Sequence, residues 1–319
     1  MSNTLITGIT GFTGSHLAEL LIKDDNNRIY GTIRGRCKQT MFIDRIKDSL
    51  TLLECDLTDF NSIEETIKDA EPDVIYHLAA QTFVPTSWRA PQETMNSNVI
   101  GTLNLLEAVR KSAFDPKILI AGSSEEYGKV GIKEVPIKET NPLKPLSPYG
   151  VSKVAQDLLG YQYHHSYGLK VIRTRAFNLM GPRSGEKIVT ANLAKQVALM
   201  EKGLIPPTLK MGTPYAIRDF NDIRDIVRAY KLAIEKCDIG EVYNICTGKG
   251  YAIANIVEVL MELSQIKFNV IEDKTRSRPS DVPILIGDST KFREATGWNP
   301  EIDFDTSMKD ILQYWREQC

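Results

Sequence analysis

The chain has 319 residues, 42% of them hydrophobic, and a formal net charge of −2 at pH 7. This length fits one large domain or a domain with an added lobe, and the near-neutral balance argues against general affinity for nucleic acid or anionic membranes. The five cysteines lie far apart, no metal-type spacing or signal peptide is seen, and no apolar run approaches the ~20 residues of a membrane span. We therefore expect a soluble cytoplasmic protein with reduced thiols and no bound metal.

The beginning of the chain carries a dinucleotide-type turn. A short strand at 4–7 runs into three glycines spaced three apart, Gly8, Gly11 and Gly14, and an apolar stripe at helical spacing follows over 17–21. Such glycines allow a tight turn, a close approach of the main chain to a pyrophosphate, and close packing of helix on strand. The bare N–H groups at the helix start then face the phosphates. An ordinary glycine-rich turn is the alternative.

Strands and helices alternate through roughly the first 175 residues. We predict further strands at 28–33, 50–55, 73–78, 117–121 and 170–174, and helices at 62–70, 93–111 and 149–167. This alternation predicts a doubly wound, Rossmann-like α/β fold with a parallel sheet covered on both faces. Ligands of such sheets bind at the carboxyl ends of the strands.

The pattern loosens after residue 178, where prolines punctuate a mixed region. The elements predicted there are helices at 222–236, 253–264, 289–296 and 306–318, and strands at 241–246 and 268–271. We interpret this part as a smaller mixed α/β substrate-binding lobe. The expected division is a dinucleotide domain of 1–177 plus about 221–247, and a lobe of 178–220 and 248–319.

Arginines follow the second predicted strand, where NAD-binding proteins of this fold place an acidic residue. Arg34 and Arg36 suit the 2′-phosphate of NADP, so we favour NADP over NAD. Asp56 and Leu57, after the third strand, are placed to contact the adenine. A helix-cap or turn role is the alternative for Asp56.

Tyr149 and Lys153 form the strongest chemical pair in the sequence. They are four residues apart on a predicted helix and so share one face. A neighbouring ammonium favours the phenolate and is expected to bring the phenol's pKa down from its usual ~10. Such a pair can move a proton on a sugar hydroxyl while hydride passes to a nicotinamide. At a nearby strand end, Ser123 can bond the same oxygen and Glu125 adds a carboxylate, whereas Glu126 is expected to be a solvated turn residue.

These motifs resemble those of the extended short-chain dehydrogenases/reductases. The glycine turn, the run 77–81, the run 123–125 and the Tyr149/Lys153 pair carry the resemblance, which covers essentially the whole chain. It is strongest to GDP-mannose 4,6-dehydratases and the related GDP-4-keto-6-deoxymannose reductases. Further matching stretches are 175–178, 181–183, 218–220 and 278–283.

The resemblance and the motifs together imply a set of site residues. The expected catalytic residues are Ser123, Glu125, Tyr149 and Lys153. The expected cofactor-binding residues are Gly8, Gly11, Phe12, Thr13, Gly14, Arg34, Asp56, Leu57, Leu78, Ala79, Ala80, Gln81, Tyr149 and Lys153. The expected substrate-binding residues are Gln81, Ser123, Asn178, Arg183, Asn192, Arg218 and Arg278, since arginine forks suit diphosphate oxygens.

The reaction that the resemblance implies is a redox-neutral dehydration of GDP-mannose. Tyr149 takes the C4 hydroxyl proton while hydride leaves for NADP, Glu125 removes the C5 proton as water departs from C6, and hydride returns to C6. The alternatives are the 4-keto reductase or another nucleotide-sugar reductase or epimerase; a non-catalytic dinucleotide sensor is disfavoured by the Tyr149/Lys153 pair. By analogy we expect a homodimer, or a tetramer, built from the helices at 93–111 and 149–167.

Overall fold

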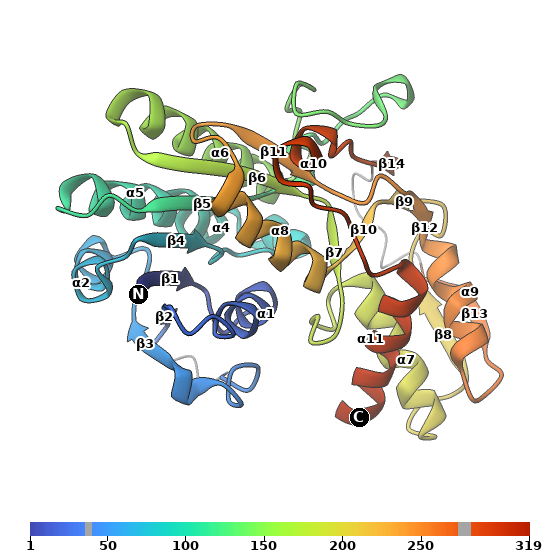
Figure 1. The fold of residues 1–319 in the computed structure, drawn as a ribbon. Helices are drawn as coiled ribbons and strands as arrows, with labels where there is room; N and C mark the ends of the chain where they lie inside the picture. Colours follow the sequence, from blue (N-terminus) through green and yellow to red (C-terminus); the bar gives the residue numbers. More distant parts are fainter. Residues whose placement is uncertain (36–39, 274–281) are drawn as a thin grey trace.

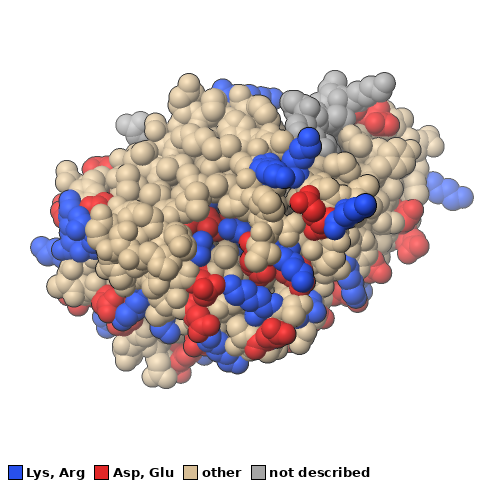
Figure 2. Space-filling model, turned by 90° about the horizontal axis from the view of Figure 1, so that it is seen from above, with Lys and Arg blue, Asp and Glu red and all other residues tan. Residues whose placement is uncertain are grey.

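The computed structural model describes residues 1–35, 40–273 and 282–319. Figure 1 shows a large sheet flanked by helices and, beside it, a smaller group of helices and short strands. None of the helices in the described ranges has the length and apolar character needed to cross a membrane. The four described cysteines are free. Figure 2 shows acidic and basic side chains intermixed on the face it presents.

The main sheet has seven parallel strands in the order β11-β6-β5-β4-β1-β2-β3. Their bounds are β1 (Ser2–Thr7), β2 (Asn27–Ile33), β3 (Leu50–Glu54), β4 (Val74–His77), β5 (Lys117–Ser123), β6 (Lys170–Ala176) and β11 (Val242–Ile245). The order reverses between β1 and β4, which opens a crevice at the carboxyl ends of these strands. The predicted doubly wound parallel sheet is confirmed.

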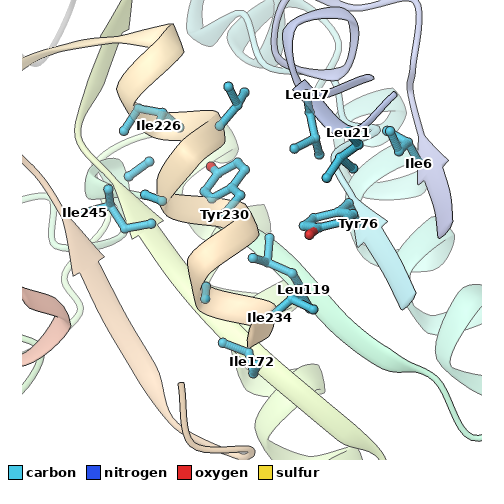
Figure 3. Packing of buried hydrophobic residues seen from close by; sticks show 14 of the residues in the cluster. Ile6, Leu17, Leu21, Tyr76, Leu119, Ile172, Ile226, Tyr230, Ile234 and Ile245 are labelled. Carbon is cyan, nitrogen blue, oxygen red and sulfur yellow. The ribbon is translucent and has the colours of Figure 1, made fainter. Parts of the chain in front are cut away.

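Helices cover both faces of this sheet. On one face lie α1 (Phe12–Leu21), α8 (Ile223–Lys236) and α10 (Thr290–Thr296); on the other lie α2 (Phe60–Ala70), α5 (Gly101–Lys111) and α6 (Pro148–Tyr167). Adjacent residues of β1 point to opposite faces of the sheet. Ile6 packs in the first core, beneath α1, α8 and α10, and Leu5 packs in the second core, beneath α2, α5 and α6. Figure 3 shows the first core, where Tyr230 of α8 packs in the same cluster as Tyr76 of β4.

Local signals explain the start and end of α6, the helix that carries Tyr149 and Lys153. Ser147 caps it by accepting a 3.0 Å hydrogen bond from the Gly150 N–H, and Pro148 occupies the first turn. Gly168 ends it at φ +76°, a left-handed conformation that glycine adopts at little cost. The prediction of a helix at 149–167 is therefore confirmed to within one residue.

The predicted helix at 93–111 is confirmed as a continuous helical run that contains a π-helical turn. The chain forms α3 (Val84–Arg89), then α4 (Pro91–Met95), a π-helical turn η2 (Asn96–Ile100) and α5. The π turn accommodates an extra residue, and the side chain of Asn98 within it is fully buried. Periodicity alone does not reveal such an insertion.

The smaller lobe has its own core. Helices α7 (Val189–Glu201), α9 (Ile253–Leu263) and α11 (Phe304–Gln318) pack around it with strands β8 (Thr208–Met211) and β13 (Asn269–Glu272). The short strands are β7 (Asn178–Met180), β9 (Ile217–Arg218), β10 (Phe220–Asp222), β12 (Tyr251–Ala252) and β14 (Ile284–Leu285), and the 3-10 turns are η1 (Lys47–Ser49), η3 (Ser124–Glu126) and η4 (Ile132–Glu134). Helix α7 and these short strands were not predicted, because two- or three-residue strands show no periodicity.

Candidate active site

The glycine turn between β1 and α1 has the geometry of a phosphate cradle. Gly8 has φ +73°, and a Cβ there would lie 2.9 Å from the Ala79 Cα. A Cβ on Gly14 would overlap the carbonyl oxygen of Gly8, so both positions demand glycine. Gly11 begins α1 with no side-chain cap, which leaves the first N–H groups free of such a partner. The half-buried Phe12 and Thr13 form the first turn beside it.

A chain of hydrogen bonds holds the end of β4 against this turn. The Thr7 hydroxyl oxygen accepts from the main-chain N–H groups of Leu78 and Ala79, both at 3.1 Å, and lies 2.9 Å from Nδ1 of His77. Thr7 therefore donates its own proton to Nδ1, and His77 Nε2–H donates to Thr102 at 2.9 Å. Burial, with a contribution from Lys153, lowers the pKa of His77 to about 3, so the ring stays neutral.

Gln81 is committed to the protein's own main chain. Its side-chain amide donates to Phe83 O and to Thr94, and accepts from the Phe83 N–H at 2.7 Å. Its main chain is held from both sides by Asn98, which accepts from Gln81 N–H at 2.7 Å and donates to Gln81 O at 3.1 Å. Gln81 thus shapes the loop 78–83, and Ala80 lies half-buried within it.

Tyr149, Lys153 and Ser123 are brought together at the carboxyl end of β5. Lys153 Nζ donates to Ala121 O at 2.8 Å and lies 5.9 Å from the centroid of the Tyr149 ring. The Tyr149 phenol is hydrogen-bonded to the side chain of Ser123. Asn98 also reaches this group, because it donates at 2.8 Å to Ser152, whose hydroxyl donates to Tyr149 O.

The protonation of the pair differs from the expectation. Burial raises the pKa of the Tyr149 phenol well above its ordinary value, although the Ser123 hydrogen bond opposes this. Burial also lowers the pKa of Lys153 to about 8, while the nearby Glu126 raises it. Desolvation penalises both charged forms, so it outweighs the mutual preference of phenolate and ammonium.

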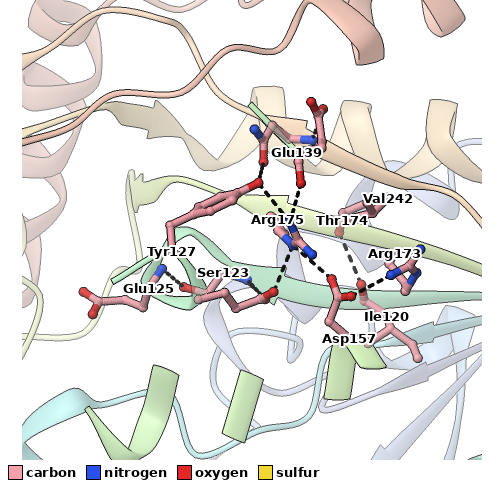
Figure 4. Close-up of polar contacts among 12 residues, drawn as sticks. Ile120, Ser123, Glu125, Tyr127, Glu139, Asp157, Arg173, Thr174, Arg175 and Val242 are labelled. Atoms are coloured by element: carbon pink, nitrogen blue, oxygen red, sulfur yellow. Dashed lines mark hydrogen bonds and ion pairs between the residues drawn. The ribbon is translucent and has the colours of Figure 1, made fainter. Parts of the chain in front are cut away.

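Glu125 and Glu126 are adjacent in η3 but have opposite surroundings. Figure 4 shows the Glu125 carboxylate directed away from the buried network around Arg175. Glu125 is half-buried, and its charge is among the causes that raise the pKa of Tyr149, so the two side chains are close. Glu126 is fully buried, which makes the expectation of a solvated turn residue wrong.

A buried ionic network lies behind these residues (Figure 4). Arg175 Nε is 3.0 Å from Asp157 Oδ2 and 3.0 Å from Glu126 Oε2, and Arg173 donates to Asp157 Oδ1 at 2.6 Å. Arg175 also donates to the Tyr127 hydroxyl at 3.1 Å. Sequence reasoning missed Asp157, although its position four residues after Lys153 on the same helix was a usable signal.

Arg34 and Asp56 lie at the ends of neighbouring strands, as expected. Both are exposed, and the charge of Arg34 contributes to lowering the pKa of Asp56, after the larger effect of its hydrogen bonds from Thr58. The Asp56 carboxylate accepts from the Thr58 N–H and hydroxyl at 2.9 and 2.8 Å, so it also has the turn role that was the alternative. Leu57 O accepts from Asn104 at 3.0 Å, which fixes this turn to α5.

The expected substrate residues of the smaller lobe differ in their surroundings. The Asn178 Oδ1 atom is buried and has no hydrogen-bond partner among the described residues, as a ligand-facing group would. Arg218 is buried on β9, and Asn192 donates to Glu186 O at 3.0 Å and accepts from Gln196. Arg278 lies outside the described residues, as does Arg36, which was expected at the 2′-phosphate of the cofactor.

Arg183, expected to bind the diphosphate, has several hydrogen-bond partners within the protein. Its φ is +68°, and its four Nη–H donors all have acceptors in the protein: both Glu19 oxygens, Phe42 O and Nδ1 of His16, whose Nε2–H donates to Pro182 O. The two Glu19 contacts are 2.8 and 2.6 Å long. Arg183 therefore links the loop after β7 to α1.

Asp219, next to Arg218, is a buried hub. Its carboxylate accepts from the Thr247 N–H and hydroxyl, the Gly248 N–H and the Gly287 N–H. Burial raises its pKa despite these donors. It ties β9 and β10 to the loop that follows β11. No cluster of three or more potential metal ligands occurs in the described part of the chain.

The fold and these side chains define a class of protein. A seven-stranded parallel sheet with a glycine turn after β1, a serine at the end of β5 and a Tyr149/Lys153 pair on α6 is an extended short-chain dehydrogenase/reductase. The family model for GDP-mannose 4,6 dehydratase matches residues 5–311. The chain belongs to this GDP-mannose 4,6-dehydratase family, as the resemblance predicted.

Two curated relatives with different names are similar to this chain over nearly its whole length. GDP-6-deoxy-D-mannose reductase of Pseudomonas aeruginosa is 31% identical over 313 residues, which covers 98% of this chain and 97% of the relative. GDP-mannose 4,6-dehydratase of Yersinia enterocolitica is 32% identical over 351 aligned positions, covering 98% of this chain and 93% of the relative.

Solved structures agree with this fold. RMD from Pseudomonas aeruginosa complexed with NADPH is 31% identical, with a TM-score of 0.86 and full coverage of both chains. UDP-glucuronic acid 4-epimerase from Bacillus cereus, in complex with UDP-glucuronic acid and NAD, is 28% identical with a TM-score of 0.89 and 99% coverage of both chains. The shared architecture is thus one that binds nicotinamide dinucleotides.

The glycine cradle gives a direct test of dinucleotide binding. Replacing Gly14→Ala should weaken the binding of NADP(H) at least about tenfold, ~1.4 kcal/mol, because the new methyl group displaces the Gly8 carbonyl. Gly185→Ala is the matched control, since nothing lies within 4 Å of its added Cβ. Titration of nucleotide fluorescence measures both. Equal affinities in the two variants would contradict the assignment of this turn.

Proposed function

We propose that the chain is a GDP-mannose 4,6-dehydratase that uses bound NADP. The observation that carries this proposal is the convergence of Ser123 and Tyr149, with Lys153 beside them and Glu125 close by, at the carboxyl edge of the sheet. When bound, NADP supplies hydride acceptance and return. Gly8, Gly11 and Gly14 would hold its pyrophosphate, and the main chain at 78–80 would line the nicotinamide side.

Tyr149 is the proposed base for the C4 hydroxyl of the hexose. Ser123, already bonded to the phenol, orients the same oxygen, and the ammonium of Lys153, 5.9 Å from the centroid of the Tyr149 ring, favours the phenolate against the burial that raises the pKa of Tyr149. Loss of the C4 proton to Tyr149 permits oxidation at C4. The resulting ketone acidifies the hydrogen at C5.

Glu125 is the proposed base for that C5 hydrogen. It lies near Tyr149, and its carboxylate is directed away from the Arg175 network (Figure 4). Taking the C5 proton, it assists the departure of the C6 hydroxyl as water. Asn178 and Arg218 are proposed to contact the nucleotide diphosphate or the sugar, with Asn192 and Arg278 as further candidates.

Two substitutions separate these roles. Tyr149→Phe should lower hydride transfer by about 10²–10⁴-fold, because the proton acceptor for C4 is lost. Glu125→Gln should stop elimination but leave partial C4 oxidation, seen as NADPH absorbance without a 6-deoxy product. Single-turnover spectroscopy with product analysis by mass spectrometry distinguishes them. Full turnover by the Glu125 variant would remove that residue from the mechanism.

A second candidate is the GDP-4-keto-6-deoxymannose reductase. The Pseudomonas aeruginosa reductase aligns over 313 positions, close to the length of this chain, whereas the Yersinia enterocolitica dehydratase aligns over 351. Incubation with GDP-mannose and trace NADP decides between them. A 4-keto-6-deoxy product without net cofactor use supports the dehydratase, and stoichiometric NADPH oxidation on the keto sugar supports the reductase.

We propose NADP rather than NAD on the charge at the end of β2. Arg34 is exposed there and its charge acts on Asp56, so a 2′-phosphate would meet a cation at this edge. Arg34→Ala should weaken NADP binding roughly tenfold while leaving NAD binding nearly unchanged, as measured by titration with each dinucleotide. An equal loss for both would assign Arg34 a structural role and leave NADP unsupported.

We also propose a homodimer formed through α6 and its neighbours. Val151, Leu158 and Tyr161 expose apolar side chains along α6, and Ile100 of η2 does the same. Helices α5 and α6 are joined by the Tyr163 hydroxyl, which donates to Glu107 at 2.7 Å. An exposed apolar stripe on adjoining helices is typical of a subunit interface.

Leu158→Glu should convert the dimer to a monomer, because a carboxylate would be buried at the centre of this stripe. Leu204→Glu is the matched control: Leu204 is 61% exposed and Leu158 52%, but Leu204 lies just beyond α7. Light scattering after gel filtration reports the mass of each variant. An unchanged dimer with Leu158→Glu would place the interface elsewhere.

The two-lobe division is likewise a proposal. The first two cores belong to the sheet and its helices, and the third belongs to α7, α9 and α11. We assign 1–177 with about 221–247 to cofactor binding, and 178–220 with 248–319 to the substrate, although α10 within the latter range packs against the main sheet. A cytoplasmic location is proposed from the free cysteines.

A further inference from the structure

Glu126 is a buried carboxylate directly behind the Ser123–Tyr149–Lys153 group. Its Oε1 accepts the Ser123 N–H at 2.7 Å, and its Oε2 lies 3.0 Å from Arg175 Nε. The carboxylate sits over the main chain of Gly122, where an added Cβ would collide with Oε1. Glu126 therefore contacts both the end of β5 and the ionic network on β6.

The charges around Glu126 are unequal in number. Three cations (Lys153, Arg173 and Arg175) face two buried carboxylates, Glu126 and Asp157. Arginine keeps its proton in proteins, so Lys153 is the cation that would yield its proton if a carboxylate were lost. The other titratable groups near Glu126 or its partners are Tyr149, Tyr127, Glu125, Glu139 and His77.

We propose that Glu126 is a positioning residue for the Tyr149–Lys153 pair: its carboxylate fixes the Ser123 main chain at the end of β5 and supplies the negative charge that keeps Lys153 protonated. The inference rests on the proposed function in so far as turnover reports it. It goes beyond that function because it assigns a positioning role to Glu126, a side chain proposed to touch neither the sugar nor the cofactor.

The direction of the pH effect follows from the charges. Burial and the charge of Asp157 raise the pKa of Glu126, which Arg175, the Ser123 N–H and Lys153 lower, and burial lowers the pKa of Lys153, so the titrations of the two groups are linked. When Glu126 loses its proton, the new negative charge opposes the loss of a proton from Lys153. Without that charge, Lys153 becomes neutral at lower pH, and activity that needs its ammonium falls earlier as pH rises.

Two variants separate the charge from the hydrogen bond. Glu126→Gln keeps an acceptor for the Ser123 N–H but removes the charge, so the alkaline limb of the kcat/KM profile should move to lower pH by roughly one unit. Glu126→Asp keeps the charge but shortens the side chain, so the limb should stay in place while kcat falls severalfold. Glu134→Gln is the matched control, because Glu134 accepts the Gly131 N–H in an exposed 3-10 turn of the same kind.

A direct readout keeps this test independent of turnover. The protein is labelled with ¹³C-lysine, and the NMR signal of Lys153 is assigned as the one that is lost in Lys153→Arg. The titration midpoint of Lys153 should fall in Glu126→Gln and stay unchanged in Glu134→Gln. An unchanged midpoint overturns the proposal whichever sugar the enzyme uses, and a shifted midpoint supports it even if GDP-mannose is not turned over. If Glu126→Gln does not fold, Glu126→Asp decides: a displaced midpoint with unchanged kcat overturns the proposal.

Discussion

The buried contact between α6 and the carboxyl ends of β5 and β6 is the constraint on which the site depends. Lys153 donates to Ala121 O on β5, and one turn later Asp157 binds Arg173 and Arg175 on β6. Removing one partner of a buried ion pair typically costs ~3–5 kcal/mol, because an uncompensated charge is left behind. The network therefore fixes the rotation of α6 about its axis, and with it the position of Tyr149.

The smaller lobe is tied to the sheet by polar anchors and by an apolar cluster in which Phe177 and Cys246 pack with Leu285. Arg183 spans from the loop after β7 to Glu19 and His16 on α1, the same helix whose start forms the phosphate cradle. Asp219 gathers main-chain N–H groups from two loops around β9. Arg183 thus connects the lobe directly to the helix that follows the glycine turn.

Much of the fold could be predicted because its signals are local. The alternating strand and helix periodicity predicted the parallel sheet. The three glycines predicted the turn, and Ser147-Pro148 predicted the start of α6. Helix α7 was not predicted, since Ile188 before it offers no capping side chain. The strands of two or three residues were not predicted either, because strands this short show no periodicity. The π turn at 96–100 was not predicted, because one inserted residue leaves the apolar pattern nearly unchanged.

For the site, the sequence by itself determined which chemical groups are present and which lie near one another along the chain, as with Tyr149 and Lys153. Only the tertiary structure decided the partners of residues distant in sequence, because charges and donors pair across elements whose approach no local pattern encodes. It turned Arg183 toward Glu19, 164 positions earlier, buried Glu126 beside Arg175, and placed Asn98 against Gln81 and Ser152. The tertiary structure also set the balance between desolvation and charge attraction. Burial, rather than the neighbouring lysine, therefore governs the pKa of the Tyr149 phenol.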